Sequence, residues 1–217
     1  MKNHPLTALF LLALAAAPRT DAQGVSLELM TGSAFNFPSS LTVRQAGYPD
    51  LSFTADYDTN PFGHGTPYYA LRVGLWEGDE AWEFGMLHHR LYLTNNPPEI
   101  QFFAIHYGYN FFLAGRAWRK GDLILHLDGG PILTSPENTV RGKVYYTGGG
   151  ILGLGYHFSG FGFTGAVSRN IPITGPSFLV MEVVLSSGWT WGIPVVEGSA
   201  DVPSVSLHGH IGLGVDL

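Results

Sequence analysis

Residues 204–217 alternate without a break between apolar side chains and polar or small ones. Apart from Gly209, one face carries only large apolar residues: Val205, Leu207, Ile211, Leu213, Val215 and Leu217. The other face carries serines, glycines, two histidines and an aspartate. Successive side chains of a strand point to opposite faces, so the pattern predicts one strand, far longer than the ~5–6 residues usual in globular proteins. A tilted strand that crosses a bilayer needs ~9–11 residues in the hydrocarbon, and this length fits that requirement.

The same alternation recurs along the rest of the chain, with charged side chains on one face and apolar side chains on the other. It is clearest in residues 25–30, 51–58, 68–75, 103–113, 123–128 and 179–186. The breaks between these segments alternate between short turns and longer loops, as they do in membrane barrels. Eleven breaks predict twelve antiparallel strands, or ten if residues 186–188 do not form a turn.

Residues 1–22 have the positive start, apolar run and cleavage site of a secretory signal peptide, in that order. Lys2 gives a positive start, residues 9–17 form a short apolar run, and Thr20 and Ala22 place small residues before a cut at Gln23. The alternative is a buried N-terminal helix. We therefore expect an exported chain with one domain, residues 23–217.

Composition argues against several other classes of protein. Loss of Lys2, Arg19 and Asp21 leaves 9 basic and 16 acidic residues, a formal charge of −7, so nucleic-acid binding is disfavoured. The chain contains no cysteine, so an exported form has no disulfide to stabilise it. After Gln23 there is no apolar run long enough for a transmembrane helix.

Two architectures share this alternation. In a soluble β-sandwich or lipocalin-like barrel the apolar face points inward, whereas in a membrane barrel it points outward. Scarce lysine on the polar faces favours the membrane barrel, because water-exposed sheets use lysine for protection. Aromatic residues near the expected strand ends are typical of interfacial girdles; they are Trp76, Trp82, Tyr92, Trp118, Tyr145, Tyr146, Trp189 and Trp191. The sequence thus predicts an all-β fold, a closed antiparallel transmembrane β-barrel that is monomeric.

On its signal peptide, alternation, girdles and terminal strand, the chain resembles the broad class of small single-domain bacterial outer-membrane β-barrel proteins. Those proteins usually end in phenylalanine, where this chain has Leu217. The resemblance implies location in the bacterial outer membrane and contact with its lipids.

The polar faces of such a barrel meet in its lumen, where charges are tolerated only when they are paired and hydrogen-bonded. The residues expected there are Glu28, Arg44, Asp56, Arg72, Arg90, His106, Asn110, Arg116, His126, Asp128, Glu182, His208 and His210. A charge-paired lumen of this kind serves a structural role or binds a small polar ligand; a narrow solute channel is the other possibility. The spacing of His208 and His210 does not define a metal site by itself, and neither a metal nor a cofactor is predicted.

Two pairs are candidates for catalysis. Asp128 lies on the same strand face as His126 and could orient its imidazole as a general base. His157 and Ser159 resemble the histidine–x–serine pair of outer-membrane lipid hydrolases, which implies an outer-leaflet lipid or lipid A hydrolase. The twelve-strand topology instead places this pair near a periplasmic turn, and Gly160 stands where some of those enzymes have asparagine. Two loops, residues 59–67 with His64 and residues 135–142, are expected to make external contacts.

Overall fold

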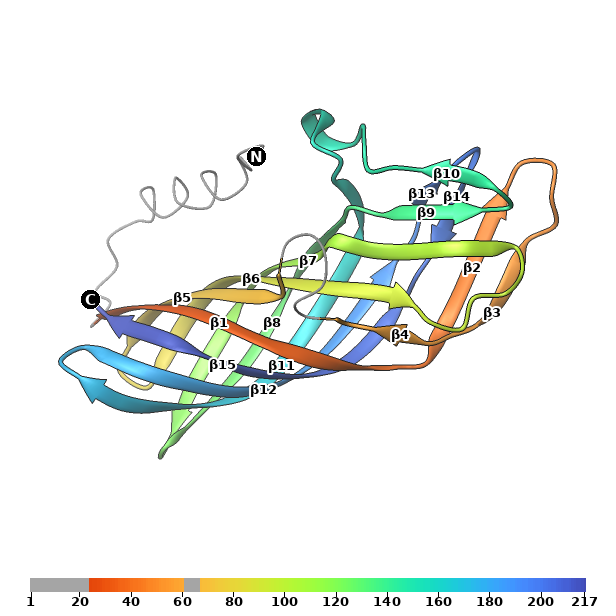
Figure 1. Ribbon diagram of the computed structural model, residues 1–217. Helices are drawn as coiled ribbons and strands as arrows, with labels where there is room; N and C mark the ends of the chain where they lie inside the picture. The colour runs from red at the N-terminus through yellow and green to blue at the C-terminus, as the bar shows by residue number, and fades with distance from the viewer. Residues whose placement is uncertain (1–23, 61–66) are drawn as a thin grey trace.

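The computed structural model describes residues 24–60 and 67–217 (Figure 1), so the expected signal peptide and His64 lie outside the described residues. Eight long antiparallel strands form a closed ring, because β6 and β7 pair directly and join the two arms of the sheet. In spatial order the ring consists of β7 (Ile100–Lys120), β8 (Leu123–Thr134), β11 (His157–Thr174), β12 (Ser177–Thr190), β15 (Ser204–Asp216), β1 (Gly24–Phe37), β5 (Tyr69–Glu77) and β6 (Glu80–Leu93).

The closed ring has fewer strands than the twelve, or alternatively ten, predicted from the sequence. Residues 159–160 and 186–188 look like turns in the sequence, yet β11 and β12 run straight through them. Glycines of these two strands make room for side chains inside the barrel: a Cβ on Gly188 would collide with Tyr109, and one on the nearby Gly162 with Phe111. Other expected strands pair outside the ring.

Those remaining strands lie at one end of the barrel (Figure 1). A second sheet has the order β13 (Ile193–Val195), β14 (Gly198–Asp201), β2 (Ser39–Gln45) and β3 (Leu51–Ala55). β9 (Glu137–Val140) pairs with the far part of β7 and with β10 (Lys143–Tyr145), and β4 (Tyr57–Asp58) pairs with β6. We call these strands, with the adjoining ends of β6 and β7, the external module. One short 3₁₀ helix, η1 (Ile151–Gly153), lies between β10 and β11.

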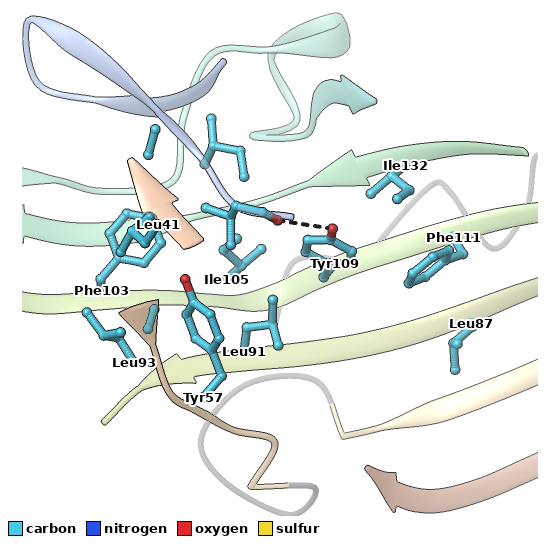
Figure 2. Close-up of a cluster of buried hydrophobic side chains, with 14 of the residues drawn as sticks. Leu41, Tyr57, Leu87, Leu91, Leu93, Phe103, Ile105, Tyr109, Phe111 and Ile132 are labelled. Carbon is cyan, nitrogen blue, oxygen red and sulfur yellow. Dashed lines mark hydrogen bonds between the residues drawn. The ribbon is translucent and has the colours of Figure 1, made fainter. Parts of the chain in front are cut away.

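The two ends of the ring differ. The connections 77–80, 120–123 and 174–177 are tight, and they lie at the same end as Gly24 and Asp216. We call this the turn end. The opposite end, the loop end, carries the external module, whose inner surface is apolar. Figure 2 shows Leu41, Leu91, Phe103 and Ile105 packed in this core, with Tyr109 at the boundary to the lumen.

The outward face of the ring is apolar and exposed. Many of its residues expose more than 40% of their surface: Leu29, Phe84, Leu127, Phe163, Met181, Val183, Leu185, Leu207, Ile211 and Leu213. A contiguous exposed apolar surface of this extent is abnormal for a monomer surrounded by water. We call it the apolar belt. None of the described residues belongs to a helix with the length and hydrophobicity to cross a membrane.

Candidate functional site: the charged interior of the barrel

Arg72 lies at the centre of the interior and contacts three carboxylates from three other strands. Its guanidinium lies 2.9 Å from Glu28 and 3.8 Å from Glu83, and it donates a hydrogen bond to Glu182. Glu28 is its direct cross-strand partner in the β1–β5 register. Glu28 and Glu83 lie on β1 and β6, the two strands that pair with β5. Glu182 is on β12, which is remote in sequence and separated from β5 by β15 and β1, so it is the curvature of the ring that brings Glu182 to Arg72.

Two histidines complete this Arg72 cluster. His126 Nδ1 lies 2.7 Å from Glu83 Oε2, and His210 Nδ1 lies 2.8 Å from Glu182 Oε1. Three carboxylates therefore meet one guanidinium, and two of them also contact an imidazole. All these residues are buried or nearly so. Their mutual ion pairs and hydrogen bonds offset the cost of removing the charges from water.

Hydrogen bonds continue from the cluster toward the loop end. The hydroxyl of Tyr68 lies 2.5 Å from His210 Nε2 and 2.8 Å from His208 Nδ1, and Ser186 lies 2.7 Å from the other nitrogen of His208. The ring of His89 packs against that of His208, with centroids 4.9 Å apart. Farther toward the loop end, the apolar core of the external module begins. The interior is thus polar in its middle and apolar at its loop end.

Little space remains inside. A cavity of about 30 Å³ adjoins Arg72, Glu83, Asp128, Glu182 and His210, which is room for one or two water molecules. A hollow of about 460 Å³ opens at the turn end, and its lining includes Arg119, Asp122, Arg169 and Asp216. Around the Arg72 cluster the described side chains therefore fill the lumen.

His126 also contacts Ser168, whose Oγ lies 2.8 Å from Nε2. Glu83, His126 and Ser168 thus have the distances of a carboxylate–histidine–serine triad. Acyl transfer further requires room for a substrate beside the nucleophile. Ser168 is only 1% exposed, and the neighbouring cavity has the size of a water molecule or two. We therefore interpret this triad as part of the structural network. The expected partner of His126, Asp128, instead lies 3.5 Å from Thr164.

The pair His157 and Ser159 does not lie where the sequence suggested. β11 begins at the loop end, so the pair lies there and not beside a tight turn. Residues 159–160 were expected to form such a turn, whereas β11 continues through them. The two side chains do not bond each other, since the only part of His157 that the Ser159 hydroxyl contacts is its backbone carbonyl. His157 Nε2 lies 3.2 Å from the hydroxyl of Tyr145 and 3.1 Å from the carbonyl of Gly148, whereas the Ser159 hydroxyl bonds Thr134 at 2.6 Å.

Of the residues expected in the lumen, the structure places Glu28, Arg72, His126, Asp128, Glu182, His208 and His210 inside the ring. Two others lie in the external module because β2 and β3 leave the ring. Arg44 is exposed and bonds Asp201 at 2.6 Å, and Asp56 is exposed next to β3.

Four more lie outside the lumen on β6 and β7. A β-bulge follows His89, and Arg90 is buried at this point with a hydrogen bond to the carbonyl of Asn60. His106 lies in the external module, 3.5 Å from Glu137. Asn110 and Arg116 point to the outer face, where Asn110 contacts His88 and Arg116 stacks over Trp82. A bulge shifts the alternation by one residue. The face of a residue beyond the bulge therefore cannot be predicted from the residues before it.

Sequence reasoning missed several members of the network: Glu83, Tyr68, Ser168 and Ser186. Glu83 had a detectable signal, since it alternates with Trp82 and Phe84, which face outward. Tyr68 and Ser186 had the same signal, since they alternate on the faces that carry Arg72 and Glu182. In the described part of the chain no group of three or more His, Asp or Glu side chains is arranged to hold a metal ion.

No protein-family model matches the chain, and no curated protein matches it either. Several solved structures are similar, all of them bacterial outer-membrane proteins. The attachment invasion locus protein Ail of Yersinia pestis is 12% identical, with a TM-score of 0.41, over 89% of this chain and 97% of that one. The outer membrane protein AlkL is 11% identical, with a TM-score of 0.48, over 93% and 95%. OprG of Pseudomonas aeruginosa is 10% identical, with a TM-score of 0.44, over 90% and 96%. At such identities no ligand or activity is transferred.

Proposed function

We propose that this protein is an integral outer-membrane β-barrel that does not conduct solutes and that anchors a folded external module at the cell surface. The observation that carries the proposal is the distribution of polarity around the ring. Charged side chains are buried inside it, while large apolar side chains are exposed outside. A soluble barrel has the reverse arrangement, and a bilayer removes this outer surface from water.

The orientation follows from the lengths of the connections. Bacterial outer-membrane barrels have short periplasmic turns and longer external loops. The turn end, where β1 begins and β15 ends, therefore faces the periplasm, and the external module faces outward. Aromatic residues on the outer face support this placement near both rims: Trp189 and Trp191 at the loop end, and Trp82 at the turn end.

A binding role belongs to the external module rather than to the lumen. The lumen cavity accommodates a water or two, which leaves no space for a small polar ligand. By contrast, the second sheet presents a folded, water-exposed surface with charged side chains such as Arg44, Asp50 and Asp201. We therefore assign contacts with external partners to this surface, with outer-membrane lipids around the barrel itself.

Two measurements test the proposal. The folded protein in outer-membrane fractions should migrate differently on SDS gels before and after heating, because a closed ring of strands resists the detergent when cold. Recovery as a soluble periplasmic protein without detergent would contradict it. In planar bilayers we expect no stepwise conductance, since side chains of the Arg72 cluster and the apolar core fill the path. Regular open-channel steps would favour the narrow channel instead.

A further inference from the structure

The segment between β10 and β11 is much longer than its path requires. Tyr145 pairs with Asn138, and His157 pairs with Thr134, so the two ends of this segment lie a few residues apart along the same edge. Residues 146–156 lie between them, and they leave the wall as a protruding loop. In Figure 1 this loop, which contains η1, projects sideways from the barrel and not beyond the tip of the external module.

The protruding loop is apolar and uncharged. Its sequence, YTGGGILGLGY, contains no Asp, Glu, Lys or Arg. Leu152 is 90% exposed and Tyr146 70%, while Ile151 and Leu154 also expose large fractions of their surfaces. Other external connections carry charges, as at Asp50, Arg141 and Glu197. A water-facing loop gains nothing from such a cluster of exposed apolar side chains.

Internal bonds give this loop a defined shape. The amide of Ile151 donates to the carbonyl of Tyr156 at 2.7 Å, and that of Gly155 donates to Gly149 at 2.9 Å. Thr147 connects the loop to Ser135 on the wall through their hydroxyls. Leu152 has φ of 52°, a left-handed conformation that costs a non-glycine residue ~1–3 kcal/mol. In a loop with five glycines, leucine occupies the position where glycine would be unstrained.

The height of the loop follows from β11. Arg169 is exposed and paired with Asp122, which belongs to the tight connection 120–123, so Arg169 lies near the turn end. From Arg169 to the exposed Phe158 there are about ten strand steps once the bulge is allowed for, which at ~3.3 Å and a ~40° tilt is roughly 25 Å. The apolar band of a membrane barrel is also about 25 Å tall. The loop therefore leaves the wall at the outer rim of the apolar belt, beside Phe158, Phe161 and Trp191.

We propose that residues 146–156 form a membrane hook, which inserts Leu152 and Ile151 among the acyl chains of the outer leaflet. This inference rests on the proposed membrane location. It adds a lipid contact made by a loop, which the alternating pattern of the strands does not predict. Lipid is the occupant favoured by continuity with the belt, by the absence of charge and by the lateral direction of the loop. Tyrosines at both ends of the loop, Tyr146 and Tyr156, suit the headgroup region.

The absence of cysteine allows single labels to be placed cleanly. Leu152→Cys, Phe163→Cys in the middle of the belt and Tyr48→Cys in the β2–β3 turn would each carry an environment-sensitive fluorophore. Each variant would be inserted into phosphatidylcholine vesicles with and without doxyl-labelled phosphatidylcholine, and checked for heat-dependent gel migration. All three sites are exposed, so we expect folding to be unaffected.

We expect the doxyl lipid to quench the labels at 152 and 163 by roughly half or more, and the label at 48 only slightly. Quenching at 163 without quenching at 152 would overturn the hook and leave the membrane location intact. A label at 152 that is shielded from water but not quenched by the lipid would also overturn it, in favour of a protein contact. If the label at 163 escapes quenching, the membrane location itself fails, and the hook with it.

Discussion

At the scale of single residues, Arg72 is the side chain on which the interior depends. It is the guanidinium that contacts Glu28, Glu83 and Glu182, and no other strand supplies an arginine or lysine to these carboxylates among the described residues. A buried pair adds little net stability compared with an apolar replacement, but removal of one partner leaves the others buried without compensation.

We expect Arg72→Met to destabilise the barrel by about 3–5 kcal/mol, because three carboxylates lose their common partner. Unfolding by urea in detergent micelles, followed by tryptophan fluorescence, would measure the loss. Arg169→Met is the matched control, since its exposed pair with Asp122 contributes at most about 1 kcal/mol. Equal effects of the two substitutions would contradict the central role of Arg72.

His106, in the external module, gives a second residue-scale prediction. Burial, and after it the charge of Arg90, lowers the pKa of His106 from 6.5 to about 4. The imidazole is thus neutral in the folded protein, while in the unfolded chain it gains a proton below about pH 6.5. Stability conferred by the neutral form is therefore fully present above pH 6.5 and declines as the pH falls toward 4.

An NMR titration of the His106 ring protons should give a midpoint near pH 4. His106→Gln should reduce the loss of stability between pH 6.5 and pH 4, because this variant has no imidazole to protonate in the unfolded chain. A midpoint near 6.5 would show that the ring is accessible to water and that the module is looser than the structure indicates.

At the scale of elements, small residues within the strands control how the interior is packed. Gly162 and Gly188 occupy inward positions on β11 and β12, beside the rings of Phe111 and Tyr109. In the sequence, Ser187 and Gly188 have the composition of a turn, and for this reason the strand count was too high. Instead of ending β11 and β12, these glycines leave the space that Phe111 and Tyr109 of β7 occupy.

Gly188→Val should therefore destabilise the barrel by about 1–3 kcal/mol through overpacking. The control is Gly209→Val on β15, an outward position with no atom within 4 Å of the added Cβ, where valine suits a strand. Thermal unfolding in detergent would compare the two variants. If valine is tolerated equally at both positions, packing against Tyr109 is not what requires glycine at 188.

At the scale of the whole molecule, the ring and the external module differ in how their strands are paired. Each ring strand has a partner on both sides, so the ring has no free edge. Within the described part of the chain the second sheet ends on β3 and β13, which are short and paired on one side only. Local opening is easiest where few backbone bonds hold a segment.

We expect the amides of β2, β3, β13 and β14 to exchange with deuterium faster than those of β8, β11 and β12 in micelles. Mass spectrometry of peptic fragments would measure both sets in the same sample. Uniform protection would indicate that the apolar core shared by β2 and β7 joins the two parts into one cooperative unit. Faster exchange in the ring would contradict the proposed anchor.

The sequence by itself determined the all-β class, the long alternating strands and the identity of several interior groups such as Glu28, Arg72 and His210. These depend on period-two patterning, which is local. Tertiary structure alone decided the strand number, since a turn and a strand glycine look alike until the packing of Tyr109 and Phe111 is known. It also decided that residues 159–160 continue a strand, which places His157 and Ser159 at the loop end. The contact of Arg72 with Glu182 likewise required the ring, because residues so distant in sequence have no local signature of their contact.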